Sequence, residues 1–401
     1  MKLKSGCIFW PQIYQGPEQQ FPKLDRDIQC DVAIIGGGIS GALVGYHLMR
    51  EGIHTIMVDR RQVGHGSTSA STGLLQYEID TPLIELIGKI GKDRAVAAYR
   101  ASVESLLAFE PLVAELGDSC GLVARSSLYL ASREKDVDPL RAECEARQSM
   151  QIDVEFLNKE SLRDAFNLSR PGALRSSRAF EVDPFRLTLQ LIRRATEMGL
   201  EVFGETEITH LTRRAEGVTL DASSGGRVSA RKVIFATGYE TMQELPADLC
   251  RLSSTYALAS QPLASFTEWP RRCLIWESAR PYLYLRTTED NRVIVGGGDE
   301  EIADPAKRDE LLEKKSHYLH ERFSELFPDI PIETACHWAG TFAQTKDGLP
   351  YIGTLPQYPH CYFALGYGGN GITFSLLAAQ ILRDLFLGKE SERTHLFGFA
   401  R

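Results

Sequence analysis

Short apolar runs alternate with amphipathic stretches along this chain, and their order predicts an α/β arrangement of strands and helices. The apolar run Val32–Ile35 is followed, after a group of glycines, by an amphipathic stretch that continues to Met49. A second apolar run covers His54–Val58. Continuous apolar runs are typical of buried parallel strands and helical periodicity is typical of the segments that join them. This part of the chain therefore predicts a strand–helix–strand unit.

The same alternation returns further along the chain. Helical patterns cover Arg94–Leu116, Asp138–Met150, Phe185–Met198 and Ile372–Leu387, and strand patterns cover Ser127–Ala131, Glu201–Phe203, Ile208–Leu211, Val218–Asp221, Val233–Gly238 and Tyr362–Leu365. Gly199 and Gly388 directly follow two of these helical patterns, where glycine commonly ends a helix. The strand–helix–strand unit near the N-terminus is thus followed by further strand and helix patterns of the same kind.

Three glycines join the first strand to the first helix. Gly36, Gly38 and Gly41 form G-x-G-x-x-G, and Asp59 ends the next strand about twenty residues later. In such a turn one glycine allows the tight bend, one lets a pyrophosphate approach the backbone, and one lets the helix pack on the strand. The helix N-terminus then offers amide groups to phosphates, and the acid accepts hydrogen bonds from ribose hydroxyls. The pattern predicts an adenine dinucleotide site, and a glycine turn without a ligand is the alternative.

Composition excludes several other classes. The chain has 401 residues and a net charge of −8, so it offers material for two or three domains and no basic stripe for nucleic acid. Its eight cysteines form no C-x-x-C pair, which favours free thiols in a reducing compartment. The apolar stretch Gly6–Trp10 is too short for a signal peptide, and the five glycines of Asp31–Met49 argue against a membrane span. We expect a cytoplasmic protein.

Four blocks together resemble the D-amino-acid-oxidase-like family of FAD-dependent amine oxidoreductases, which includes glycine, sarcosine and γ-glutamylputrescine oxidases. They are the dinucleotide turn with Asp59, the loop GHGSTSASTG, the pair FEVDP and ATG, and the tail TKDGLPYIG with GYGGNG. The blocks follow the order of the family over nearly the whole chain. The resemblance implies a Rossmann-like FAD-binding domain, discontinuous in sequence, and a substrate domain with a mixed or antiparallel sheet. The expected boundaries are 1–86, 155–253 and 337–401 for the FAD domain and 87–154 and 254–336 for the substrate domain.

The resemblance also implies which residues hold FAD without a covalent bond. In the family the GYGGNG loop lies against the flavin pyrimidine, where a helix N-terminus stabilises the negative charge of the reduced ring. The hydroxyls of the GHGSTSASTG loop can donate to the pyrophosphate or the ring. The expected cofactor residues are Gly36, Gly38, Ile39, Ser40, Gly41, Asp59, Arg60, Gly66, Ser67, Thr68, Gly73, Thr237, Gly238, Gly368, Gly369, Asn370, Gly371 and Ile372.

A nicotinamide-linked dehydrogenase is the main alternative that the first fingerprint leaves open. An enzyme with two dinucleotides would need a second fingerprint, and the candidate is Gly296–Gly298. Glu301 stands where its third glycine belongs, and Asp299 and Glu300 would repel a pyrophosphate. FAD alone is therefore favoured.

The substrate side departs from the family pattern in two places. Glycine and D-amino-acid oxidases carry a carboxylate-binding arginine at a slot that here is Phe342, which cannot form that ion pair. Sarcosine oxidases attach flavin to a cysteine at a slot that here is Gly340, with Cys336 four residues too early. Simple α-amino acids and covalent flavin are thus disfavoured, and the γ-glutamylputrescine oxidase branch fits better.

The expected reaction passes hydride from the carbon of a C–N bond to flavin N5, and the imine then hydrolyses. Tyr282, Tyr284 and Arg286 share one face of a predicted strand because side chains alternate with period two. The candidate residues around the substrate are Tyr282, Tyr284, Arg286, Phe342 and Gln344.

The predicted partners are a small amine or modified amino acid and oxygen or another electron acceptor, without nucleic acid or a membrane span. Two alternatives from other classes stay open. One is the flavin subunit of a multi-subunit amino-acid dehydrogenase, and the other is a non-amine or RNA-modifying flavoprotein.

Overall fold

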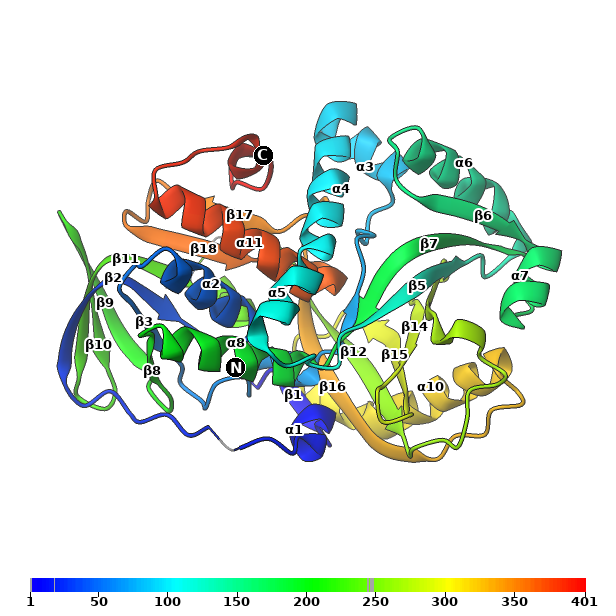
Figure 1. The fold of residues 1–401 in the computed structure, drawn as a ribbon, viewed down its shortest axis with the longest axis horizontal. Helices are drawn as coiled ribbons and strands as arrows, with labels where there is room; N and C mark the ends of the chain where they lie inside the picture. The colour runs from blue at the N-terminus through cyan, green and yellow to red at the C-terminus, as the bar shows by residue number, and fades with distance from the viewer. Residues whose placement is uncertain (1, 18, 244, 246–248) are drawn as a thin grey trace.

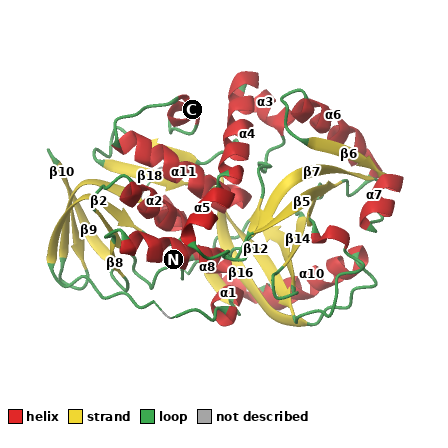
Figure 2. Ribbon diagram, in the orientation of Figure 1, coloured by secondary structure: helices red, strands yellow, loops and turns green. Residues whose placement is uncertain are grey.

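The computed structural model describes residues 2–17, 19–243, 245 and 249–401. In this part of the chain the strands form two large mixed sheets, with helices packed on each (Figure 1). Figure 2 shows helices packed on both sheets and the helices α4 and α5 in the middle of the molecule. The predicted α/β class is confirmed.

The eight-stranded sheet contains the predicted dinucleotide unit. Its order is β17-β18-β11-β2-β3-β8, and β10 and β9 continue from β11 as an antiparallel extension. The strands β18, β11, β2, β3 and β8 are parallel, whereas β17 is antiparallel to β18. The bounds are β2 Asp27–Ile35, β3 Thr55–Val58, β8 Glu201–Phe203, β9 Ile208–Arg214, β10 Gly217–Ala222, β11 Arg227–Phe235, β17 Tyr351–Thr354 and β18 Cys361–Leu365.

Three helices cover one face of this sheet and bring their apolar sides into its core. They are α2 (Ile39–Arg50), α8 (Pro184–Glu197) and α11 (Gly371–Phe386), which lie side by side in Figure 1. Helix α8 begins with Pro184 after Asp183, whose side chain accepts hydrogen bonds from Phe185 N and Arg186 N at 2.9 Å. Its buried stripe includes Leu187 and Leu191, so amphipathic spacing directs it onto the sheet.

The ten-stranded sheet forms the second half of the molecule. Its order is β1-β16-β12-β15-β14-β13-β5-β7-β4, and β6 pairs with β7. The bounds are β1 Lys4–Gly6, β4 Leu74–Leu75, β5 Val123–Leu130, β6 Val154–Asn158, β7 Gly172–Glu181, β12 Arg251–Ser260, β13 Leu274–Glu277, β14 Leu283–Thr287, β15 Val293–Glu300 and β16 Thr334–Gln344. Helix α10 (Leu312–Leu326) packs Leu319 and Phe323 against this sheet.

The remaining helices surround these two units. Their bounds are α1 Phe9–Ile13, α3 Leu83–Ile90, α4 Lys92–Leu107, α5 Phe109–Leu116, α6 Val137–Gln148, α7 Lys159–Phe166, α9 Pro305–Glu310 and α12 Glu392–Leu396. The single helix expected over Arg94–Leu116 is divided into α4 and α5 around Ala108. Pro111 explains the division, since its ring removes the amide that would bond Leu107 and clashes with that carbonyl.

The chain crosses between the two sheets more often than the expected boundaries imply. Residues 172–181 were assigned to the FAD domain, but β7 lies in the ten-stranded sheet. The strands β1, β4 and β16 also belong to that sheet. β1, β4 and most of β16 nevertheless lie within the ranges 1–86 and 337–401 that were expected to form the FAD domain. A strand pattern identifies a strand but not the sheet that it joins. The division into 1–86, 155–253, 337–401 and the complementary segments stays a prediction.

No helix in the described ranges is both long enough and apolar enough to cross a membrane.

Candidate cofactor and substrate site

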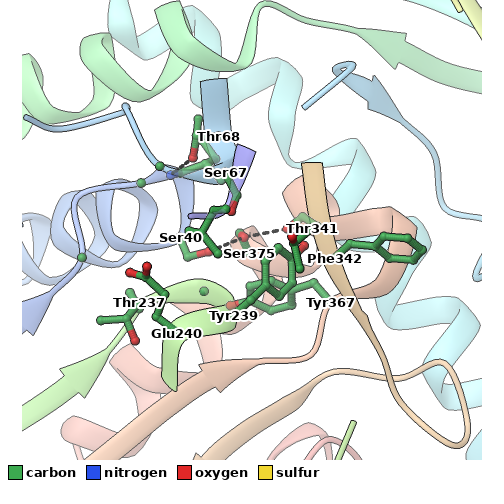
Figure 3. Close-up of a pocket in the computed structure, with 18 of the residues that line it drawn as sticks. Ser40, Ser67, Thr68, Thr237, Tyr239, Glu240, Thr341, Phe342, Tyr367 and Ser375 are labelled. Carbon is green, nitrogen blue, oxygen red and sulfur yellow. Dashed lines mark hydrogen bonds between the residues drawn. The ribbon is translucent and has the colours of Figure 1, made fainter. Parts of the chain in front are cut away.

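A cavity of about 660 Å³ lies between the two sheets. Loops that follow the carboxyl ends of β2, β3, β11 and β18 line one part of it, and residues of β12, β14, β15 and β16 line the other. Ligands of open parallel sheets bind at this edge, outside the carboxyl ends of the strands. Figure 3 shows Ser67 and Thr68 on one side and Thr237, Tyr239 and Glu240 on the other.

The glycine turn after β2 is held in close contact with its neighbours. Gly36 has φ +106°, and a Cβ there would lie 2.4 Å from the carbonyl oxygen of Ala236. A Cβ on Gly41 would lie 1.8 Å from the carbonyl oxygen of Gly36. Gly36 and Gly38 line the cavity, whereas Gly41 lies behind them and allows α2 to start. Gly36 and Gly38 therefore expose the backbone to the cavity, whereas Gly41 allows the helix to pack closely on the turn.

Thr68 lies directly over this turn. Its Oγ1 accepts a hydrogen bond from Ile39 N at 2.9 Å, and a Cβ on Gly38 would lie 3.0 Å from the same oxygen. Thr68 and Ile39 both line the cavity. Thr68 belongs to the loop Gly64–Gly73, which we call the hydroxyl loop. This loop and the N-terminus of α2 thus form one surface that can bind phosphate oxygens.

Ser67 gives independent support for a polar ligand here. Its hydroxyl oxygen is buried, lines the cavity and has no hydrogen-bond partner among the described residues. Buried hydroxyls are rarely left unpaired. The neighbouring Ser69 is already used, since it donates to Gly66 O at 3.0 Å and accepts from the Lys4 ammonium. The Ser67 hydroxyl can therefore donate to a ligand, and Gly66 beside it also lines the cavity.

Asp59 lies in the cavity wall at the end of β3. Its Oδ2 accepts a hydrogen bond from Gly37 N at 2.7 Å and its Oδ1 accepts one from Arg61 N at 2.8 Å. Burial raises the pKa of this carboxyl, and the two backbone hydrogen bonds partly oppose the shift. Each carboxylate oxygen has a further lone pair, so Asp59 can accept hydrogen bonds from ribose hydroxyls without losing its own partners.

Glu240 is a cavity residue that the sequence patterns did not indicate. It forms ion pairs with Arg60 and with Arg61, the latter at 3.1 Å between Nη2 and Oε1. All three side chains line the cavity near Thr237 and Gly238. A single acidic residue after a strand has no sequence signature, so its position beside Arg60 becomes visible only in the folded structure.

The loop that opens α11 forms another wall. Gly368–Asn370, Gly371 and Ile372 all line the cavity. Gly369 N donates to Asp80 Oδ2 at 2.8 Å, and the Asn370 side-chain amide donates to the carbonyl oxygen of Glu78. The positive end of the α11 dipole therefore faces the cavity, where it stabilises negative charge.

The α2 and α11 sides of the site are also tied together. Ser40 Oγ and Ser375 Oγ lie 2.8 Å apart (Figure 3), and Ser375 Oγ donates to Gly371 O at 2.6 Å. Ser40 is among the expected cofactor residues and lines the cavity.

The ten-stranded sheet supplies aromatic rings to the other end of the cavity. Tyr282 and Tyr284 line it together with Phe342 and Trp276, and the two tyrosine ring centroids are 5.5 Å apart. Acidic and amide side chains lie among these rings, and the lining residues of this kind are Gln76, Glu78, Asp80 and Asp299. We call this part the substrate end and the part built on the eight-stranded sheet the dinucleotide end.

Two of the expected substrate residues lie elsewhere. Arg286 is outside the cavity lining and only 1% exposed, because its guanidinium donates to Gly73 O at 2.7 Å and to Val182 O at 2.6 Å. Burial lowers its pKa to about 10. Gln344 is exposed at the last position of β16 and is also outside the lining. Gly73 contacts Arg286 and does not line the cavity, so the hydrogen bond between these two residues supports the hydroxyl loop from behind.

The sequence patterns did not indicate the acids of the substrate end. Asp80 belongs to no motif, and Asp299 stands out only as the acid that follows the glycine run Gly296–Gly298. The residues Gly296–Gly298 belong to β15 of the ten-stranded sheet, where a Cβ on Gly296 would lie 2.2 Å from the ring of Tyr284. That glycine run makes room for an aromatic ring.

The arrangement fits a noncovalent dinucleotide. Glycines expose the backbone, the Ser67 hydroxyl has no partner among the described residues, and Asp59 can accept hydrogen bonds from a ribose. No cysteine is among the described lining residues, and the Cys336 thiol donates to the carbonyl oxygen of Cys7. The site therefore has the parts of a flavin-adenine dinucleotide site.

Comparison with known sequences identifies the class. The sequence model described as "DAO: FAD dependent oxidoreductase" matches residues 31–385. The chain belongs to this DAO family of FAD-dependent oxidoreductases, which confirms the predicted family, enzyme class and cofactor.

Individual relatives are distant but match over almost the whole chain. Glycine oxidase of Geobacillus kaustophilus is 27% identical over 90% of this chain and 94% of its own length. Gamma-glutamylputrescine oxidoreductase of Escherichia coli is 23% identical over 94% of this chain and 88% of its own length. The crystal structure of the G. kaustophilus glycine oxidase has the same fold, with a TM-score of 0.78, 23% identity and coverage of 93% and 99% of the two chains.

Proposed function

We propose that this enzyme oxidises the C–N bond of a small amine or N-substituted compound and disfavours simple α-amino acids. The proposal draws on the family, whose relatives include enzymes named for glycine and for gamma-glutamylputrescine. The observation that carries it is the charge of the substrate end, which holds carboxylates and aromatic rings.

The distribution of basic groups supports the same conclusion. Among the described lining residues, the basic side chains are Arg60, Arg61, His210 and Arg213. All four belong to or directly follow strands of the eight-stranded sheet. An α-carboxylate needs a cationic anchor beside the reacting carbon, and Phe342 lines the cavity in the slot where some family members carry an arginine. Amines do not need this anchor.

Bound FAD supplies the hydride acceptor for this chemistry, and the imine product hydrolyses to a carbonyl compound and an amine or ammonia. The contribution of the protein is to desolvate and orient the amine. Tyr282, Tyr284 and Trp276 form apolar walls that exclude water from a reacting C–H bond. These side chains therefore need only to hold the amine in a reactive orientation, and the reaction requires neither a nucleophile nor a catalytic triad.

Anaerobic mixing of the holoenzyme with a substrate panel tests the proposal. Primary and N-methyl alkylamines are expected to bleach the oxidised flavin band faster than glycine or D-alanine. Fast bleaching by D-amino acids, with none by amines, would contradict the proposed substrate class while leaving the family intact.

Admission of air to the reduced enzyme separates the two possible electron acceptors. Rapid recovery of the band with release of peroxide identifies an oxidase, which is the outcome that we expect. Persistent bleaching until a dye or quinone is added identifies a dehydrogenase.

A further inference from the structure

Two carboxylates at the substrate end, those of Asp80 and Asp299, have no ion-pair partner in the described part of the chain. Among the described residues, no basic nitrogen lies within 4.0 Å of Asp80 or Asp299. The nearest influences are Arg280, which is exposed and donates to backbone carbonyls such as Ala279 O at 3.1 Å, and Lys315. Lys315 is already bound to Gly298 O and to a neighbouring glutamate at 2.6 Å each. Neither cation neutralises the cavity.

Asp80 lies directly over the loop that opens α11. Besides the hydrogen bond from Gly369 N, its carboxylate oxygens lie 2.7 Å from the positions that a Cβ on Gly368 or Gly369 would take. The Tyr282 hydroxyl lies 3.2 Å from that same position on Gly369. The carboxylate of Asp80 and the hydroxyl of Tyr282 therefore meet at one point of the cavity wall.

Asp299 lies beside the second tyrosine. The Thr255 side chain forms a hydrogen bond with Asp299, and Thr255 Oγ1 lies 3.2 Å from the Tyr284 hydroxyl. The other oxygen of Asp299, Oδ1, is buried and has no hydrogen-bond partner among the described residues. Burial raises the pKa of Tyr282 and of Tyr284, and the negative charges of Asp80 and Asp299 both add to the rise. The two acids thus surround one pair of aromatic rings.

Other polar atoms of this end also lack partners in the described part of the chain. Glu78 is 4% exposed, and its Oε2 is unpaired, as is the indole nitrogen of Trp276. Glu78 has a cation nearby, since Arg147 Nη1 lies 3.8 Å from its Oε1. Buried acceptors without donors imply a ligand that supplies them, and Asp80 and Asp299 need one with positive charge.

We propose that the substrate is a diamine-class compound whose second ammonium group binds between Asp80 and Asp299, beside Tyr282 and Tyr284. This inference rests on the proposed function. An amine must be neutral at nitrogen when its carbon gives up hydride, so a monoamine would leave both carboxylates without a counter-charge. A second ammonium supplies N–H donors and charge to both acids, and aromatic faces further stabilise it.

The selectivity between matched amines tests this assignment. The probes are 1,4-diaminobutane, butan-1-amine and 4-aminobutan-1-ol, which share a four-carbon chain and differ at the far end. In anaerobic stopped flow we expect the holoenzyme to reduce with 1,4-diaminobutane roughly thirtyfold or more efficiently than with either monoamine. In Asp299→Asn the ratio of diamine to monoamine efficiency should fall toward one.

Controls separate charge recognition from structural damage. Glu300→Gln removes the neighbouring acid, which is partly exposed, pairs with Lys315 and lies outside the cavity lining, and it should keep the wild-type ratio. Asp80→Asn should resemble Asp299→Asn. Asp80→Asn also loses the hydrogen bond from Gly369 N and could therefore lose flavin. In that case the selectivity ratio of Asp299→Asn alone tests the cation site. Equal efficiency of the diamine and the monoamines in the wild type, or an unchanged ratio in Asp299→Asn, would overturn the inference.

A binding measurement distinguishes this inference from the proposed function. Calorimetric titration of dithionite-reduced holoenzyme with 1,4-diaminobutane reads binding without turnover, and Asp299→Asn should weaken it by at least tenfold. If no amine bleaches the flavin but the diamine still binds through Asp299, the proposed reaction fails and the cation site stands. If amines bleach the flavin but the diamine has no advantage, the reaction stands and the cation site fails.

Discussion

The two ends of the cavity are built in different ways. At the dinucleotide end, short segments provide backbone groups and small side chains, as Gly36–Gly41 and Ser67–Thr68 do. At the substrate end, single side chains come from separate segments: Asp80 follows β4, Tyr282 and Tyr284 lie at β14, and Asp299 lies in β15.

This difference separates what the family shares from what distinguishes this enzyme. Backbone donors and glycines recognise a pyrophosphate whatever the substrate is. The charge and shape of the other end decide which molecule reaches the reacting position. Changes at the dinucleotide end should therefore remove the cofactor, whereas changes at the substrate end should alter selectivity and local stability.

The largest effect is expected from Gly38→Val. The added side chain would enter the space beside Thr68, where a Cβ alone lies 3.0 Å from Oγ1. The purified variant should contain almost no FAD by absorbance while its far-ultraviolet circular dichroism stays that of the wild type. Gly88→Ala is the matched control, because a Cβ there meets nothing within 4 Å and Gly88 lies outside the cavity lining. A folded Gly38→Val protein with full flavin content would refute the fingerprint assignment.

A smaller loss is expected from Asp59→Ala. Removal of the charged acceptor for the ribose hydroxyls should weaken FAD binding by about 1.5–3 kcal/mol, measured by titrating apoprotein with FAD and following flavin fluorescence. Asp31→Ala serves as the control, since Asp31 lies in the neighbouring strand β2 but pairs with Arg231 at 3.2 Å on the surface. Unchanged FAD affinity in Asp59→Ala would place the ribose elsewhere.

The smallest effect concerns stability at the substrate end. Burial raises the pKa of Asp299 to about 6, with Asp80 adding to the shift and Lys315 and Arg280 opposing it. The folded state therefore favours the protonated acid, a contribution that is fully present below the unfolded pKa and lost as the pH rises through about 6. Asp299→Asn should raise the unfolding temperature of substrate-free holoenzyme by about 2–4 °C at pH 8.

The same comparison at pH 4.5 should show a smaller difference between Asp299→Asn and wild type, because Asp299 in the folded wild type is then largely protonated. Thermal unfolding followed by circular dichroism at the two pH values checks this. A gain that is equal at both pH values would mean that packing, rather than charge, explains the stabilisation.

The sequence predicted the dinucleotide end because its signals are local. Gly36, Gly38 and Asp59 have a fixed spacing along the chain, and parallel strands bring their carboxyl ends to one edge. Apolar runs such as Val233–Gly238 and Tyr362–Leu365 placed the other two loops at this edge. Most strands of the eight-stranded sheet, and the helices α2, α8 and α11 on it, followed from the same periodicities.

The substrate end could not be predicted in the same way. Asp80 and Asp299 are more than 200 residues apart, and only the pairing of the ten-stranded sheet brings their segments to one cavity. Strand periodicity placed Tyr282, Tyr284 and Arg286 on one face, but it did not show that Arg286 would be taken up by Gly73 and Val182. An isolated charged residue reveals its role only through its three-dimensional neighbours.

Product analysis of one anaerobic turnover tests the central claim most directly. The amine from the panel that bleaches the flavin fastest is mixed with the holoenzyme, and carbonyl product, released ammonia or amine, and reduced flavin are quantified together. The account predicts one carbonyl compound and one released nitrogen per flavin reduced, with slower reduction when the carbon of the C–N bond carries deuterium. Flavin reduction without cleavage of a C–N bond, or reduction only by compounds that contain no amine, would contradict it.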